Sequence, residues 1–212
     1  MKRCFLVVID SLGVGEAPDA ELYGDLGTNT LANVSKAVGG VDLPNMDKLG
    51  FGKITDVLNM NDLNIATVGR LSEDSVGNDS TTGHWELAGL TTKTEFSIFE
   101  NGFPQELIQK IEKQAKCHFI GNRHASGTEI IEELGSEHLE TGNLILYTSG
   151  DSVFQIAAHQ EVCSKEKLYE ICKISRKYCN QYNIGRVIAR PFVGNEGSFK
   201  RTYDRKDFGM AP

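Results

Sequence analysis

The stretch "CFLVVIDSLGVGEAP", residues 4–18, joins a short apolar run to a loop that contains two glycines. The run is rich in β-branched residues, which is typical of strands that are buried on both faces of a parallel sheet. "NTLANVSKAV", residues 29–38, follows as a predicted helix that starts at Asn29 or Thr30 and ends before Gly39. A strand, a loop and a helix in this order predict an α/β fold with a layered sheet.

Predicted helices and strands continue along the second half of the chain. Residues 103–116 form the clearest amphipathic helix, with Leu107, Ile108 and Ile111 on one face. The other expected elements are a short helix within residues 43–52, a helix that Thr128 caps and Gly135 closes, a strand that runs into a polar turn within residues 142–153, a helix that Ser164 caps, and a strand that ends at Pro191.

The composition is that of a globular protein with an acidic balance. Of the 212 residues, 40% are hydrophobic and 24% are charged, and the formal net charge is -7 at pH 7. Nucleic acids and anionic membranes would repel this charge, so neither is expected as the main partner. The five cysteines include no C-x-x-C pair, which favours a reducing compartment. The apolar run before Asp10 is too short for a signal core or a membrane span, so a cytoplasmic location is expected.

Asp10 is the first candidate site residue, because it lies where the predicted strand gives way to the loop. The carboxyl ends of parallel strands face the ligand crevice in α/β sheets, and a carboxylate at that point suits Mg²⁺ or Mn²⁺. The alternative is that Asp10 only caps the loop by accepting hydrogen bonds from backbone N–H groups. The residue pattern leaves both roles open.

A run of hydroxyls in "VGNDSTTGHWELAG", residues 76–89, precedes another predicted helix. A helix N-terminus also stabilises phosphate, and beside a metal a Ser or Thr hydroxyl is a competent nucleophile for phosphoryl transfer. From spacing alone, the capping role is favoured over the nucleophilic one. The four residues suited to capping are Asp79, Ser80, Thr81 and Thr82.

Arginines form the third candidate group. The guanidinium fork binds phosphate oxygens in a bidentate way, so an acidic protein that gathers arginines can form a phosphate pocket. Taken singly, each arginine is equally well explained as a solvated surface residue. Asp151, in the turn after a predicted strand, either binds substrate hydroxyls or stabilises that turn. The arginine candidates are Arg123, Arg186, Arg190, Arg201 and Arg205.

Five stretches together resemble those of the phosphopentomutases, a metal-dependent family of the alkaline phosphatase superfamily. They are "FLVVIDSLGVGEAPDA", "DSTTGHWELAG", "GNRHASGTEIIEELG", "YTSGDSVFQIAAH" and "GRVIARPFVGNEGSFKRT", in the family's order and nearly end to end. The family interconverts ribose or deoxyribose 1-phosphate and 5-phosphate through a phosphorylated enzyme and two manganese ions. The resemblance therefore implies an isomerase of nucleoside catabolism, an alkaline-phosphatase-like sheet, and Mn²⁺, or Mg²⁺, as cofactor.

The resemblance assigns roles to individual residues by motif. Asp10 and Ser80 would be metal ligands, and Ser80 would also be the nucleophile that carries the phosphoryl group. The family usually has threonine at the position of Ser80, and this mild departure leaves Thr81 and Thr82 as rival nucleophiles. The residues that match the family's sugar-phosphate pocket are Ser149, Asp151, Arg186 and Arg201.

The resemblance also predicts how the chain is divided. Residues 1–97 would be the N-terminal part of the catalytic core, and residues 98–212 an inserted α+β cap that selects the substrate. Most of the family's metal ligands lie further along the chain, so a further segment or a second chain is expected to complete the core. The alternatives are a non-catalytic homologue that binds sugar phosphates, a truncated homologue that depends on a partner chain, and another superfamily reaction, such as that of a phosphatase or a phosphoglycerate mutase.

Overall fold

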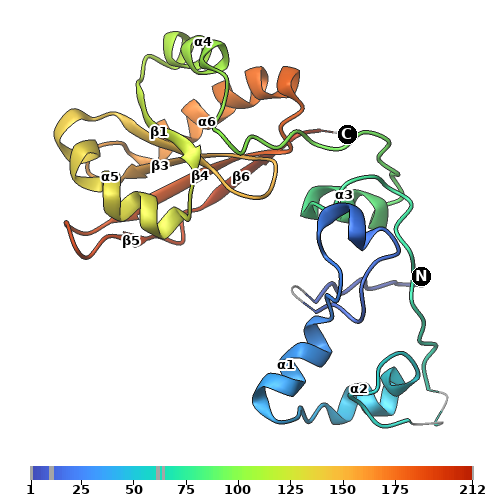
Figure 1. Cartoon of the computed structure of the whole chain (residues 1–212). Helices are drawn as coiled ribbons and strands as arrows, with labels where there is room; N and C mark the ends of the chain where they lie inside the picture. Colours follow the sequence, from blue (N-terminus) through green and yellow to red (C-terminus); the bar gives the residue numbers. More distant parts are fainter. Residues whose placement is uncertain (1, 10–11, 61–62, 64, 212) are drawn as a thin grey trace. The chain divides into compact units, whose positions relative to one another are not determined.

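The computed structural model describes residues 2–9, 12–60, 63 and 65–211 (Figure 1). Two compact units make up the chain, residues 1–74 and residues 75–212. The described residues of the second unit form a six-stranded sheet with helices on both faces, which confirms the predicted α/β class. The expected functional division between residues 97 and 98 stays a prediction. Within the described ranges, no helix has the length and apolar composition needed to cross a membrane.

The first unit contains two short helices that form where they are predicted. The elements described in this unit are η1 (Ala20–Tyr23), α1 (Thr30–Val38), α2 (Pro44–Leu49) and η2 (Phe51–Lys53). The Asn29 side chain caps α1 by accepting a hydrogen bond from the Ala32 N–H at 3.2 Å, and Gly39, with a φ of 79°, ends the helix. α2 starts at Pro44, whose missing N–H suits the first turn of a helix.

The predicted strand at residues 4–9 is wrong. Residues 2–9 have no regular secondary structure, and Phe5 and Val7 are 82% and 79% exposed. A strand is held by hydrogen bonds to its neighbours, and the described residues of the first unit contain no strand that could pair with this run. Its apolar composition alone therefore does not make it a strand. Asp10, which follows it, lies outside the described residues.

A mixed sheet forms the centre of the second unit. Its strands are β1 (Phe119–His124), β2 (Leu144–Thr148), β3 (Val153–His159), β4 (Arg186–Val193), β5 (Lys200–Arg201) and β6 (Lys206–Gly209). They lie in the order β1-β2-β3-β4-β5, and β6 also pairs with β4. β1 runs parallel to β2 and β3 runs parallel to β4, whereas the other pairs are antiparallel. Val153 and Arg186, at the starts of β3 and β4, are register partners.

Helices cover both faces of this sheet. The helices of the second unit are α3 (Ser80–Leu87), α4 (Gln105–Ala115), α5 (Gly127–Thr141), α6 (Lys165–Cys179) and η3 (Asn180–Tyr182). α4 and α6 pack on one face and α5 on the other (Figure 1). The predicted apolar face of residues 103–116 is confirmed, since Leu107 and Ile111 on α4 are fully buried there, as is Leu168 on α6. Side chains alternate along a strand, so Phe154 joins this core while Gln155 lies on the α5 face, beside Tyr147.

Two further local predictions are confirmed. β2 forms within residues 142–153 and runs into a polar turn. Ser164 caps α6, because its hydroxyl accepts a hydrogen bond from the Lys167 N–H at 3.3 Å. The side chain at a helix N-cap satisfies an N–H group that has no partner within the helix, which fixes where α6 begins.

α5 is longer than predicted, and Gly135 does not close it. The helix continues to Gly142, which follows it with a φ of 74°. Gly135 is buried inside the helix, where a Cβ atom would overlap the ring of Phe199. This glycine therefore makes room for an aromatic ring instead of ending the helix. Thr128 is not the cap either, because Ser126 occupies that position without a side-chain hydrogen bond to the helix.

β4 also extends beyond its predicted end at Pro191, as far as Val193. The strand pairs with β6 up to Ala189 and with β5 from Phe192. Pro191, which has no N–H to donate, lies between these two pairings, where β4 changes partner. A proline in a strand is therefore tolerated here, because neither antiparallel ladder includes it.

Candidate functional site

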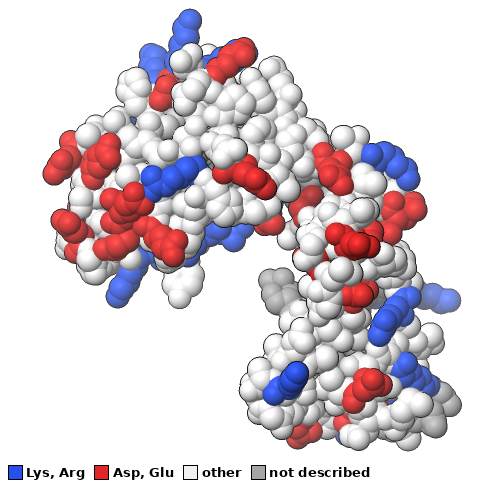
Figure 2. Space-filling view, viewed as in Figure 1, with Lys and Arg blue, Asp and Glu red and all other residues white. Residues whose placement is uncertain are grey.

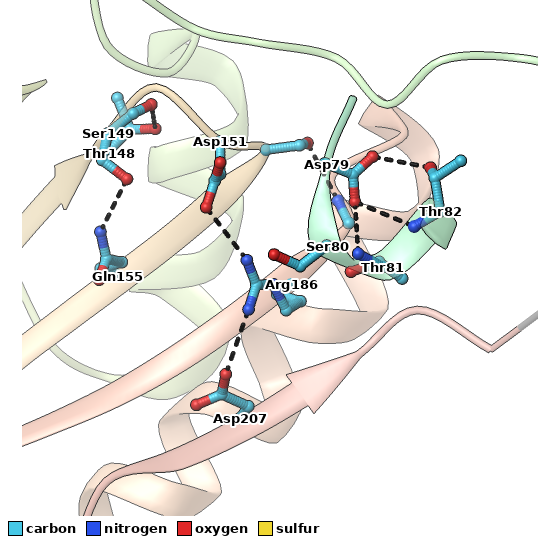
Figure 3. A network of polar contacts seen from close by, with 12 residues as sticks. Asp79, Ser80, Thr81, Thr82, Thr148, Ser149, Asp151, Gln155, Arg186 and Asp207 are labelled. Atoms are coloured by element: carbon cyan, nitrogen blue, oxygen red, sulfur yellow. Dashed lines mark hydrogen bonds and ion pairs between the residues drawn. The ribbon is translucent and has the colours of Figure 1, made fainter. Parts of the chain in front are cut away.

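A polar turn between β2 and β3 carries two of the predicted pocket residues, Ser149 and Asp151. The register of the β3/β4 pair places this turn next to Arg186, the first residue of β4. Asp151 Oδ2 accepts a hydrogen bond from Arg186 Nη2 at 3.2 Å (Figure 3). Two residues that the resemblance assigns to one pocket, far apart in the sequence, thus form an ion pair.

Ser152 anchors this turn to the neighbouring strand. Its hydroxyl donates a hydrogen bond to the Ser97 carbonyl at 2.6 Å and accepts one from the Gly185 N–H at 3.0 Å. The Arg186 N–H donates to the Ser152 carbonyl at 3.1 Å. These bonds hold the starts of β3 and β4 together, so they also keep Asp151 beside Arg186. The sequence motifs do not single out Ser152.

Arg186 also lies close to a second carboxylate, that of Asp207 on β6 (Figure 3). Arg186 Nη1 is 3.7 Å from Asp207 Oδ2. Arg205 donates to both Asp207 oxygens, at 2.6 Å each, and this pairing raises the pKa of the Arg205 guanidinium. The positive charge of Arg186 is therefore shared between two carboxylates, one of which also pairs with Arg205.

Gln155 connects Ser149 to a further arginine. Gln155 is 4% exposed, and its Nε2 donates to Ser149 Oγ at 3.5 Å while its Oε1 accepts from Arg190 Nε at 3.1 Å. A buried amide with both polar atoms bonded fixes the side chains on either side of it. The motifs do not predict this connection, because it depends on the register of three strands.

Arg190, Arg201 and Arg205 lie close enough for their charges to act on one another. Burial lowers the pKa of the Arg190 guanidinium, and the charges of the other two lower it further. Burial also raises the pKa of the Tyr147 hydroxyl, a rise that the three arginines oppose. Arg201, on β5, is exposed and forms no side-chain hydrogen bond or ion pair with the described residues. Three arginines therefore lie near one another on this face of the sheet, and Arg201 among them pairs with no carboxylate of the described residues, which suits an anion.

Arg123 lies in a different electrostatic environment. It forms an ion pair with Glu133 on α5, and both side chains are exposed. Glu133 belongs to an acidic group on this helix, and Figure 2 shows acidic side chains gathered over the part of the molecule that α5 occupies. Because these carboxylates repel phosphate, Arg123 is not placed as a phosphate ligand. The group consists of Glu129, Glu132, Glu133, Glu137 and Glu140.

Asp79 is the N-cap of α3. Its Oδ1 accepts hydrogen bonds from the N–H groups of Thr81 at 2.8 Å and Thr82 at 3.2 Å (Figure 3). Its Oδ2 accepts a further bond from Thr82 Oγ1 at 2.8 Å. Two of the first-turn N–H groups are thus occupied by Asp79 and are not free for a phosphate.

The three hydroxyls at the start of α3 differ in accessibility. Thr82 is fully buried and bonded to Asp79, and Thr81 is half-buried. Ser80 is exposed, and its hydroxyl has no hydrogen-bond partner among the described residues. A nucleophilic hydroxyl has to be reachable by its substrate. Ser80 is therefore the most accessible of the three and Thr82 the least.

The structure brings the predicted site residues together only in part. Asp151 and Arg186 are paired, and Ser149 lies in the same turn. Within the described ranges, no hydrogen bond or ion pair joins Ser80 to these residues. Asp10 lies outside those ranges, and no three His, Cys, Asp or Glu side chains within them are grouped to hold a metal ion. The described residues by themselves therefore do not provide the predicted metal centre.

Several known proteins are similar to the chain along its whole length. The "Phosphopentomutase" of Carboxydothermus hydrogenoformans is 53% identical over 215 residues, which cover 100% of this chain. The proteins of the same name from Thermotoga petrophila and Kosmotoga olearia are 52% and 50% identical over 214 residues, or 99% of the chain. The predicted resemblance to the phosphopentomutases is confirmed. No protein-family model matches the chain.

The phosphopentomutase relatives are longer than this chain, which spans 55% of the length of each. The matched region includes α3, the turn between β2 and β3, and the arginines of β4 and β5, because the match extends over the whole chain. The match to these phosphopentomutases therefore includes all five stretches on which the predicted resemblance rests.

Proposed function

We propose that this chain is part of a phosphopentomutase, which interconverts ribose or deoxyribose 1-phosphate and 5-phosphate in cytoplasmic nucleoside catabolism. The observation that carries the proposal is the 53% identity along the entire chain to a protein of that name. An exposed hydroxyl on α3 and the arginines of the α5 face support it. Phosphoryl transfer needs a nucleophile and groups that balance the charge of the phosphate.

In the proposed cycle, Ser80 carries the phosphoryl group. Phosphorylated Ser80 transfers this group to the free hydroxyl of the sugar phosphate, which forms a bisphosphate and restores the serine hydroxyl. After the bisphosphate has reoriented, Ser80 Oγ attacks its other phosphorus, and the bond between that phosphorus and the sugar oxygen breaks. The exposure of Ser80 supports this role, and Asp79 holds the first turn of α3 in place through Thr81 and Thr82.

The pocket residues would bind the sugar phosphate by exchanging partners. The side chain of Arg201 is available to a phosphate, whereas that of Arg186 is bonded to Asp151. A phosphate that approaches Arg186 would replace the Asp151 carboxylate, since both are anions that suit the guanidinium fork. Asp151 would then be free to accept hydrogen bonds from the sugar hydroxyls, and Ser149 would contact the substrate from the same turn.

The resemblance implies Mn²⁺ as the cofactor, with Mg²⁺ as an alternative, and Asp10 and Ser80 as two of its ligands. The remaining ligands would come from a further segment or a second chain, because the described residues contain no group of three ligands. Such an ion balances charge on phosphate oxygens and lowers the pKa of a bound hydroxyl. Within the described residues, the arginines supply positive charge that would also balance a phosphate.

Isothermal titration calorimetry of the full chain with ribose 5-phosphate tests the substrate class. We expect Arg201→Ala to weaken binding about tenfold or more, because a hydrogen bond to a charged group contributes roughly 1.5–3 kcal/mol. Arg123→Ala is the matched control, because it removes an exposed arginine that pairs with Glu133. Equal affinities of the wild type and Arg201→Ala would contradict the proposed pocket.

The second candidate is a sugar-phosphate-binding homologue that does not catalyse transfer. It is favoured by one observation: the described residues bring Asp151 and Arg186 of the proposed pocket together in an ion pair. Ser80→Ala separates the two candidates. In a mutase this variant loses phosphorylation and keeps ribose 5-phosphate binding, whereas in a binding protein every measured property stays unchanged.

A further inference from the structure

Gln155 lies between a group that can only donate a hydrogen bond and a group that can donate or accept one. On one side, Arg190 Nε is 3.1 Å from Gln155 Oε1. On the other side, Ser149 Oγ is 3.5 Å from Gln155 Nε2. Gln155 itself is 4% exposed, so water does not freely replace either partner. The neighbour that fixes the orientation of the Gln155 amide therefore also decides whether the amide donates a hydrogen bond to the other neighbour or accepts one from it.

Arg190 determines which way the amide faces. Burial lowers the pKa of its guanidinium, but arginine remains protonated at neutral pH, so its Nε–H is always a donor. A donor of this kind requires an acceptor, and the oxygen is the only acceptor in the Gln155 amide. Turning the amide over would place an N–H group against another N–H group inside the protein, which is costly.

The direction of the second bond follows from the first. With the Gln155 oxygen on Arg190, its NH₂ group faces Ser149, and Ser149 Oγ accepts. A hydroxyl that accepts along one direction keeps its own hydrogen for another. The Ser149 hydroxyl donates to no acceptor among the described residues, and Ser149 is only half-buried.

We propose that Arg190 and Gln155 are positioning residues that hold the Ser149 hydroxyl as a hydrogen-bond donor toward the substrate. A deprotonated phosphate oxygen accepts only, so a fixed donor at Ser149 suits the phosphate group of the sugar phosphate. Asp151, two residues further along the same turn, accepts only and suits the sugar hydroxyls. The turn thereby distinguishes the two ends of its substrate by hydrogen-bond direction. The identity of the substrate rests on the proposed function, whereas the direction of the Ser149 hydroxyl does not.

Neutron diffraction from crystals of the deuterated full chain tests the direction without any ligand. We expect the Ser149 hydroxyl deuteron to point away from Gln155, and a deuteron of the Gln155 amide to point at Ser149 Oγ. A Ser149 deuteron directed at Gln155 would overturn the proposal.

A double-mutant cycle measured by calorimetry with ribose 5-phosphate tests the consequence for binding. Gln155→Glu keeps an acceptor for Arg190 but has no donor for Ser149, so the Ser149 hydrogen turns toward the new carboxylate. The new negative charge acts equally with and without the Ser149 hydroxyl, so comparison with the Ser149→Ala background cancels its effect. We expect Gln155→Glu to weaken binding about fivefold to tenfold more in the presence of Ser149 than in the Ser149→Ala background.

Equal effects of Gln155→Glu in the two backgrounds would show that the amide does not act through Ser149. Thermal unfolding midpoints of all four proteins control for folding, and we expect them to stay close because glutamate pairs with Arg190. If no form of the chain binds ribose 5-phosphate, the proposed substrate is wrong, and the neutron result alone decides the direction of the hydroxyl.

Discussion

Asp151 and Arg186 form an ion pair at 3.2 Å between the turn before β3 and the first residue of β4. The pair depends on the parallel register in which Val153 lies opposite Arg186, and Ser152 fastens the two strand starts to each other. It places an acceptor and a cation next to each other in the proposed pocket. The carboxylate occupies the position at Arg186 that a phosphate would need, so the two anions compete.

This competition predicts opposite effects of Asp151→Asn on two ligands. The variant removes the carboxylate from Arg186, so inorganic phosphate should bind about twofold to fivefold more tightly, in line with the energy of a partly exposed ion pair. Ribose 5-phosphate should bind more weakly, because the sugar hydroxyls lose a charged acceptor. Calorimetry with each ligand measures both effects, and Glu133→Gln, which breaks an ion pair elsewhere, should change neither. Weaker binding of inorganic phosphate to Asp151→Asn would refute the competition.

The cap of α3 predicts a local loss of stability in Asp79→Ala. Asp79 satisfies the N–H groups of Thr81 and Thr82, and loss of an N-cap costs about 1–2 kcal/mol. Exchange of these two amide hydrogens should therefore become about 5–30-fold faster. Ser80→Ala is the control, because the exposed Ser80 hydroxyl has no partner among the described residues and its removal should leave exchange unchanged. Unchanged protection in Asp79→Ala would show that its side chain does not hold the helix.

His138 predicts how the stability of the second unit depends on pH. It is fully buried between α5 and the sheet, with Nδ1 bonded to the Asn143 carbonyl at 2.6 Å and Nε2 accepting from the His159 N–H at 2.8 Å. Burial lowers the pKa of His138, the Asn143 bond opposes this, and His159 lowers it further. The folded pKa thus lies below the unfolded value of about 6.5, and the unfolded chain binds more protons as the pH falls.

Stability from His138 should therefore be complete above pH of about 6.5 and decrease below it. Thermal unfolding of the wild type and of His138→Gln between neutral and mildly acidic pH measures this. The introduced glutamine amide offers an acceptor to the His159 N–H and has no proton to gain, so the variant should lose less stability on acidification. The same loss in both proteins would assign the pH dependence to other groups.

Gly135 predicts a steric effect inside α5. A Cβ atom there would overlap the ring of Phe199, and overpacking of this kind costs about 1–3 kcal/mol. Gly135→Ala should therefore lower the thermal unfolding midpoint, although alanine is the better helix former. Gly150→Ala is the matched control, since nothing lies within 4 Å of the added atom. A midpoint for Gly135→Ala at or above that of the wild type would show that the ring moves aside freely.

The amphipathic helices could be predicted from the sequence because their signal is local. One or two helical turns of sequence are enough to recognise the apolar spacing of Leu107 and Ile111 on α4 and the capping position of Ser164 before α6. The apolar run at residues 4–9 carries an equally clear pattern but forms no strand, since a strand also depends on neighbours that its own residues do not encode. Gly135 shows the same limit, because Phe199, the residue that requires it, lies in a distant part of the chain.

The candidate site likewise contains residues that the sequence identifies and residues whose roles depend on the fold. Motifs identify Asp151 and Arg186 one at a time, and the β3/β4 register then joins them. Gln155 and Ser152 lie within one of the matching stretches but are not singled out by it, because a buried amide or hydroxyl gains its role only from the atoms that the fold places on either side. Arg123 is the converse case: its residue type suits phosphate, and only the surrounding acidic residues of α5 argue against that role.

Peptide mass spectrometry of the protein at its natural length, after incubation with ribose 1,5-bisphosphate and Mn²⁺, tests whether Ser80 is the nucleophile. We expect a phosphoryl group on Ser80 in the peptide that contains α3, and its absence in Ser80→Ala. A phosphoryl group on Thr81 or Thr82 instead, or conversion of ribose 1-phosphate to ribose 5-phosphate by Ser80→Ala, would contradict it.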